Sequence, residues 1–285
     1  MSMPLIKIKT SAFSLCFFIQ IGFSQNLYRI NEIAIIDLKG KKDFSPDLIT
    51  VSNKQIFVLD KKSRLLAKIQ QDTLHTVGGF GGSSNGMFDP VDLLANQLDV
   101  FVLDQSLGKI SRFDFNLNLI QRLSISNDEP KYPSCFNIDS KRNILFYSKE
   151  EDIVYKTKSI SSKFSPFIDM NFLSISQNCL IDFAVNKKDN YAAIFSCINQ
   201  LSTFNRNGKP IRRFKLDLIN PFKVLWFDNV WAVFNNSGQL QIQHSQVLDL
   251  GIANAEVLDV ARENNSLYLL TNTSIQIFEI SKIPF

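Results

Sequence analysis

Short apolar strands recur along the chain at a nearly regular spacing. The clearest pair is Ile56–Asp60 and Val100–Asp104, in which an apolar run ends in an aspartate. Weaker copies follow, so that six equivalent positions lie 44, 45, 48, 37 and 37 residues apart: Phe57, Phe101, Phe146, Ile194, Trp231 and Tyr268. A repeat of about forty residues, without a sustained helical period, predicts six sheet-forming units.

Each copy lies between further strands. A short apolar run precedes it, and an alternating strand such as Lys109–Phe113 follows it, with the period of two that marks a half-buried strand. The Asn207-Gly208 pair then favours a hairpin into a fourth strand. Four strands in each of six units predict an all-β fold, a six-bladed β-propeller with four-stranded antiparallel blades. A sandwich or a solenoid is the rival all-β fold.

The two ends of the chain complement each other. The last unit contains only three strands, and the N-terminal segment Glu32–Leu38 offers the missing one. We expect this segment to pair with the last blade and to close the ring. Phe57, Phe101, Trp231 and Tyr268 are then expected in the core between blades rather than on a binding platform.

The first 24 residues follow the layout of a secretory signal peptide. Lys7 and Lys9 precede the apolar run Ala12–Phe23, and small residues lead up to a cleavage site after Ser24. The run is too short to span a bilayer comfortably, although a buried strand or an uncleaved anchor is the alternative. We therefore predict a signal peptide over 1–24 and one propeller over 25–285. The mature chain is expected to be exported to a periplasm or the extracellular space, with no transmembrane segment after cleavage.

Composition and cysteine usage narrow the function classes. The chain of 285 residues is 45% hydrophobic and carries a net charge of only +4, which argues against a nucleic-acid binder. Two histidines, His75 and His244, fall on predicted outer strands of different blades, so they do not suggest a shared catalytic site.

Export permits a disulfide between Cys179 and Cys197 that leaves Cys135 single. No C-x-x-C motif is present, so the cysteines do not have metal-ligand spacing. We expect three buried free thiols that behave as small apolar residues.

One unit resembles a known repeat. The stretch Gly78–Pro90, read as GGFGGSSNGMFDP, is similar to the start of an NHL repeat, and Val100–Asp104 followed by Lys109–Asp114 is similar to its second half. The resemblance covers residues 78–114, is partial around Asp47–Asp60 and is weak elsewhere. It implies an NHL-like propeller. It implies no activity, because such propellers serve as scaffolds, ligand-binding modules and occasional enzymes.

The first strand of each blade should line a central channel, and its first residues should open onto one face. Aligning the six units places these residues near that mouth: Asp47, Asp92, Cys135, Asp182, Lys223 and Asp259. The NHL pattern usually has glycine where Asp92 stands. A functional interpretation makes Asp47, Asp92, Asp182, Lys223 and Asp259 a ligand site. The four aspartates would then hold a divalent metal, with calcium as the candidate ion and no other cofactor expected. In the structural interpretation, each aspartate accepts backbone N–H groups of its own or the next blade.

No catalytic motif emerges, so no catalytic residue is assigned. We expect an exported, monomeric, non-enzymatic binding or scaffold protein that presents one propeller face to a protein, glycan or envelope partner. The alternative is a metal-dependent hydrolase or lyase, lactonase-like, with its cation at the channel mouth. A basic cluster, Arg206–Lys215, suggests either an anionic contact or an outer strand charged against edge-to-edge aggregation, and the second is preferred.

Overall fold

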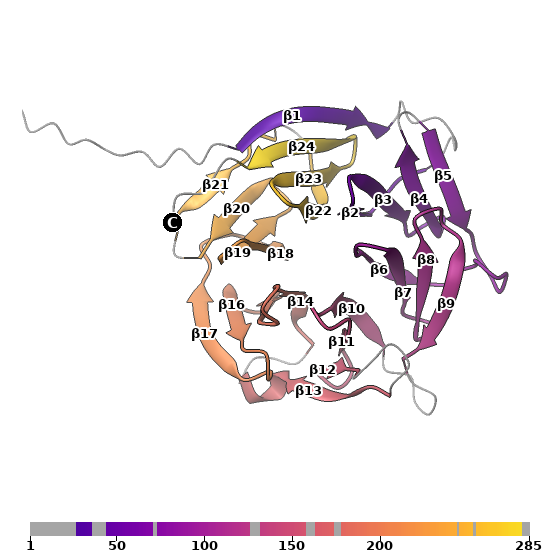
Figure 1. Cartoon of the computed structure of the whole chain (residues 1–285). Coiled ribbons are helices and arrows are strands. Elements are labelled where there is room, and N and C mark those ends of the chain that lie inside the picture. Colours follow the sequence, from indigo (N-terminus) through magenta and orange to yellow (C-terminus); the bar gives the residue numbers. More distant parts are fainter. Residues whose placement is uncertain are drawn as a thin grey trace, which may run out of the picture.

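Six four-stranded antiparallel sheets stand around a central channel, which confirms the predicted six-bladed propeller (Figure 1). The computed structural model describes residues 27–35, 44–70, 73–125, 132–157, 163–173, 178–243, 245–252 and 255–280. The predicted signal peptide and His244 lie outside these residues. Within them, no helix is long and apolar enough to cross a bilayer.

The blades follow one another along the chain, each running from the axis outward. The first contains β2 (Leu48–Ser52), β3 (Gln55–Asp60), β4 (Leu65–Gln70) and β5 (Thr73–Gly78). The second contains β6 (Pro90–Ala95), β7 (Asp99–Asp104), β8 (Lys109–Asp114) and β9 (Leu119–Ser124). The third contains β10 (Pro133–Ile138), β11 (Ile144–Ser148), β12 (Ile153–Lys156) and β13 (Ser165–Asp169), and the short 3-10 helix η2 (Met170–Leu173) follows it.

The remaining three blades have the same order. The fourth contains β14 (Leu180–Val185), β15 (Tyr191–Phe195), β16 (Gln200–Phe204) and β17 (Pro210–Lys215). The fifth contains β18 (Pro221–Phe227), β19 (Val230–Asn235), β20 (Gln239–Ile242) and β21 (Val247–Asp249). The sixth contains β22 (Val257–Glu263), β23 (Ser266–Thr271), β24 (Ser274–Ile280) and the N-terminal β1 (Leu27–Ala34).

Strand β1 closes the ring from the outside of the sixth blade (Figure 1). It pairs antiparallel with β24, with Ile33 opposite Ile275. The predicted closure is therefore confirmed. The strand begins earlier than expected, because it spans Leu27–Ala34, and residues 36–38 of the expected segment lie outside the described residues.

The core lies between neighbouring blades. The second strand of each blade has apolar residues on both faces, so all six residues of β7 are buried. Such continuous apolar runs form because each blade packs a sheet on both of its sides. Four residues predicted for this core are at most 8% exposed, which confirms their placement: Phe57, Phe101, Trp231 and Tyr268.

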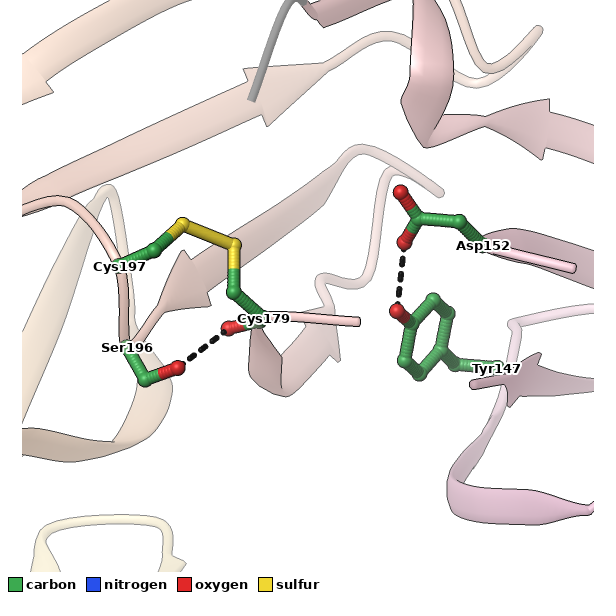
Figure 2. The surroundings of a disulfide bond; sticks show 5 residues. All are labelled: Tyr147, Asp152, Cys179, Ser196 and Cys197. Atoms are coloured by element: carbon green, nitrogen blue, oxygen red, sulfur yellow. Dashed lines mark hydrogen bonds between the residues drawn. A yellow bond between two sulfur atoms is a disulfide. The ribbon is translucent and has the colours of Figure 1, made fainter. Parts of the chain in front are cut away.

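The cysteines do not all stay free. Cys179, just before β14, and Cys197, in the β15–β16 turn, form a disulfide (Figure 2). Their Cα atoms are 5.7 Å apart, because the start of the inner strand β14 and the β15–β16 turn lie at the same end of the fourth blade. Ser196 donates its backbone N–H to the Cys179 carbonyl at 2.7 Å and holds the two segments together. The prediction of three free thiols was wrong for this pair, whereas Cys135 is free and buried as expected.

Candidate functional site

The inner strands place one residue of each blade at the same level of the channel. Five of them contain a β-bulge after their first residue, as between Pro90 and Asp92 in β6. The residue that follows each bulge occupies the equivalent position: Asp92, Cys135, Asp182, Lys223 and Asp259. The sequence alignment of these five is therefore confirmed.

Asp47 does not join this ring. Strand β2 has no bulge, and Leu48 lies opposite Leu59 just as Asp92 lies opposite Leu103. Leu48 therefore holds the position that the alignment gave to Asp47. The Asp47 carboxylate instead accepts the backbone N–H of Lys61 at 2.7 Å, in the β3–β4 turn.

The three aspartates of the ring stand on every second blade, and each binds the next blade. Each Oδ2 accepts one backbone N–H from the following inner strand, at 2.8–2.9 Å: Phe136 to Asp92, Val224 to Asp182 and Ile49 to Asp259. Asp92 also accepts the N–H of Leu93 through Oδ1. These bonds are those of the structural interpretation, because they fasten three of the six blade junctions.

Lys223 supplies the positive charge of the ring. Its Nζ lies 3.1 Å from Asp259 Oδ1. Burial raises the pKa of Asp92 to about 7 and that of Asp182 to about 6, although Lys223 lowers both. Burial also works against the charged ammonium, but the surrounding carboxylates outweigh it and raise the pKa of Lys223. The ring therefore holds a fixed cation and two carboxylates that titrate near neutral pH.

Cys135 is the neutral member of the ring. Burial raises the pKa of its thiol well above the usual range, and the nearby Asp182 and Asp92 raise it further. The side chain therefore stays protonated at physiological pH, and it packs in an apolar cluster with Leu180 and Phe183. These surroundings are those of a structural thiol rather than a nucleophile.

A cavity of about 150 Å³ occupies the channel beside this ring. Its polar lining comes from the inner strands, which also contribute apolar residues: Thr50, Asp92, Asn137, Asp182, Lys223 and Arg262. Its size suits a few water molecules or one small group.

The calcium prediction depends on carboxylate oxygens that are free to coordinate. Asp92 uses both oxygens to accept backbone N–H groups, and Asp259 divides its oxygens between a backbone N–H and Lys223. In the part of the chain that the structure describes, no group of three or more His, Cys, Asp or Glu side chains is placed to hold one metal ion. Lys223 already offsets the carboxylates, so the geometry favours their structural role, and the calcium site stays a prediction.

The face of the propeller on which the inner strands begin carries a set of exposed hydrophobic side chains that sequence analysis missed. One stands in each connection from the first blade to the fifth, with exposed fractions of 70%, 50%, 83% and 70%: Phe80, Tyr132, Phe172 and Ile219. We call them the channel-mouth residues, because these connections lead into the first residues of the inner strands. The only sequence signal was a large apolar residue outside the alternating strands.

Contacts with the turns and strand ends of the propeller hold two of these residues in place. The Arg64 guanidinium of the β3–β4 turn lies 4.7 Å over the Phe80 ring. Asn235, at the end of β19, donates its side-chain N–H to the Ile219 carbonyl at 3.1 Å. Phe80 and Ile219 are thus held in place while their side chains stay exposed.

Comparisons with known proteins agree with the fold. No family model and no curated protein matches the sequence. The structure is similar to virginiamycin B lyase from Staphylococcus aureus, with a TM-score of 0.64 and 11% identity over 90% of this chain and 100% of that chain. It also resembles YCF48 bound to D1 peptide, with a TM-score of 0.58 and 10% identity over 83% of this chain and 79% of that chain.

A further similar structure is the extracellular domain of BT4673 from B. thetaiotaomicron, with a TM-score of 0.59 and 9% identity over 89% of this chain and 42% of that chain. These likenesses show the β-propeller fold. The narrower NHL-repeat resemblance stays a prediction, because no family model supports it.

Proposed function

We propose that this chain is an exported, non-enzymatic binding protein whose channel-mouth face takes a protein or peptide partner. The observation that carries the proposal is the set of four channel-mouth residues, one on each of four consecutive blade connections. Large side chains that stand 50–83% exposed gain about 1–2.5 kcal/mol each when a partner covers the part that is still exposed. Aromatic residues of this kind are the usual centres of binding energy in protein interfaces.

The proposed compartment agrees with the cysteine chemistry. The Cys179–Cys197 disulfide is of a kind that persists in oxidising compartments and is rare in the cytosol. The predicted signal peptide points to the same compartment. One similar structure is described as an extracellular domain, and another has a bound peptide. A glycan or another envelope component is the second class of partner, since aromatic faces also stack on sugar rings.

The competing proposal is a metal-dependent lyase or hydrolase. A virginiamycin B lyase has a similar fold, although at 11% identity that likeness extends to the fold alone. A thermal melt with EDTA and with millimolar calcium separates the two. A calcium-dependent rise of the midpoint that Asp92→Asn abolishes would favour the enzyme proposal, because only a ligand of the native state stabilises it.

The binding proposal is tested by two matched variants of the mature chain. One replaces the channel-mouth residues with serine: Phe80, Tyr132, Phe172 and Ile219. The other replaces four exposed hydrophobics of the outer strands and the opposite face with serine: Ile30, Ile120, Ile211 and Leu98. Immobilised proteins are exposed to the envelope fraction of the producing cell. A partner retained by the wild type and the second variant, but lost with the first, supports the proposal. Equal retention by both variants contradicts it.

A further inference from the structure

The face opposite the channel mouth is strongly basic over the third and fourth blades. It is built from the turns that join the first to the second strand and the third to the fourth strand of each blade. Six exposed cations stand on three of these turns: Lys141, Arg142, Lys187, Lys188, Arg206 and Lys209. We call these residues the basic face. Because the whole chain carries a net charge of only +4, this is a local concentration of charge.

Side-chain caps hold these turns in fixed conformations. Asp139 Oδ1 accepts the backbone N–H groups of Lys141 and Asn143, both at 2.9 Å. Asn186 Oδ1 accepts the N–H groups of Lys188 and Asn190 in the equivalent turn, also at 2.9 Å. The same pattern in two neighbouring blades fixes the backbone of both turns, on which both pairs of cations are exposed.

The turns are also joined to one another across the blade junction. Asp189 accepts both the N–H and the hydroxyl of Ser140, each at 2.8 Å, which links the fourth blade to the third. Gly208, in the turn that carries Arg206 and Lys209, packs so closely on β13 that an added Cβ would lie 2.9 Å from the Phe167 carbonyl oxygen. The described turns of the basic face are therefore joined across the junction of two blades.

The acidic groups of these turns offset only a small part of the charge of the six cations. Asp139 is paired with the largely buried Lys156, with Nζ–Oδ2 at 2.8 Å. Asp189 accepts hydrogen bonds from the uncharged Ser140, so its carboxylate offsets one charge of the six. None of the six cations forms an ion pair with any residue that the structure describes. Their charge therefore faces solvent.

We propose that the basic face docks the protein onto an anionic lipid bilayer. A plane can meet cations that project from several turns of one face at once, whereas a linear polyanion follows a line of charges. Each Lys or Arg near such a surface adds to the electrostatic attraction. This attraction decays over about one Debye length from the lipid headgroups. Docking in this orientation turns the channel-mouth face away from the membrane, where a partner can reach it. The inference does not depend on the proposed function.

Vesicle co-sedimentation of the mature chain tests this docking. The vesicles contain phosphatidylcholine alone or with about 30 mol% phosphatidylglycerol. We expect binding to the anionic vesicles only, weakened as the ionic strength rises from about 0.05 to about 0.5 M. The triple variant Lys141→Gln, Lys187→Gln, Lys188→Gln should bind roughly a hundredfold more weakly. It keeps every backbone N–H of the capped turns, and it leaves the positive-φ residue Arg142 in place.

The control changes the same number of charges on the channel-mouth face: Lys61→Gln, Lys62→Gln and Lys149→Gln, all exposed. We expect it to bind as the wild type does. Unchanged melting midpoints verify that both variants are folded. Equal binding to neutral and anionic vesicles, or an equal loss in both variants, would overturn the inference. Retention of dextran sulfate without vesicle binding would also overturn it, in favour of a soluble polyanion.

Discussion

Replacing Lys223 with methionine removes the only cation of the channel ring and leaves Asp92, Asp182 and Asp259 facing one another. The Lys223 Nζ–Asp259 Oδ1 distance of 3.1 Å corresponds to about 5 kcal/mol at an effective dielectric constant of about 20. Loss of one partner from a buried pair typically costs about 3–5 kcal/mol. We therefore expect Lys223→Met to lower the free energy of unfolding by about 4 kcal/mol at pH 8.

The loss of unfolding free energy that Lys223→Met causes should be smaller at pH 5 than at pH 8, by roughly 2 kcal/mol. The pKa values of Asp92 and Asp182, about 7 and about 6, leave both carboxyl groups protonated there, so that Lys223 then faces one charged partner instead of three. Urea unfolding measures both values, because urea does not screen charges, and the fluorescence of Trp226 and Trp231 in the same blade reports the transition. Lys61→Met, at an exposed position of the channel-mouth face, is the control. A cost below about 1 kcal/mol, or one independent of pH, would refute this account of the ring.

Three further predictions concern stability. Because burial raises the pKa values of Asp92 and Asp182, protonation of the native state adds stability that is complete below their unfolded pKa of 3.8 and is lost as pH rises through 6–7. The wild-type urea midpoint should thus fall between pH 5 and pH 8, and a rising midpoint would contradict the shifts. Replacing Cys179 and Cys197 with serine opens a loop of 18 residues and should cost about 3 kcal/mol in the same assay, whereas a loss under about 1 kcal/mol would argue against the disulfide. The Asp104 carboxylate accepts the backbone N–H groups of Phe88, Asp89 and Leu107. Asp104→Ala removes this acceptor and should lower the free energy of unfolding by about 2–4 kcal/mol, measured from thermal melts. An unchanged melting midpoint would show that these hydrogen bonds are dispensable.

The repeat of apolar strands predicted most of the fold because burial between blades demands it. Runs such as Val100–Leu103 are apolar on both faces, which suits a strand packed on two sides, and the Asn207-Gly208 turn marks a hairpin. The start of β1 was less predictable, because an edge strand with one exposed side carries a weaker pattern than a buried one. Its residues Ile30 and Asn31, for example, are exposed.

The candidate ring was predictable wherever a bulge follows the first residue of the inner strand. Counting from the strand start fails in β2, because this strand has no bulge and the register moves by one residue. Proline spacing would have corrected it: Pro90 precedes Asp92 by two residues, and Pro46 precedes Leu48 by two. The sequence does not show that each aspartate of the ring binds the following blade. This contact depends on which strands are neighbours in space.

The two surfaces could not be assembled from the sequence alone. Arg206 and Lys209 were visible as part of a basic cluster on one blade. The link from Ser140 to Asp189 joins a basic turn of the third blade to a second basic turn of the fourth, which the sequence does not show. Local sequence shows that a turn is charged. It does not show which turns share a face.

Site-specific photo-crosslinking in the producing cell tests the central claim that the channel-mouth face binds a protein partner. A photoreactive amino acid replaces Phe172, which is 83% exposed on that face, or Leu98, which is 59% exposed on the opposite face. We predict that a defined protein adduct forms at position 172 and is absent at position 98. An adduct of the same protein at both positions, or no protein adduct at position 172, would contradict the account.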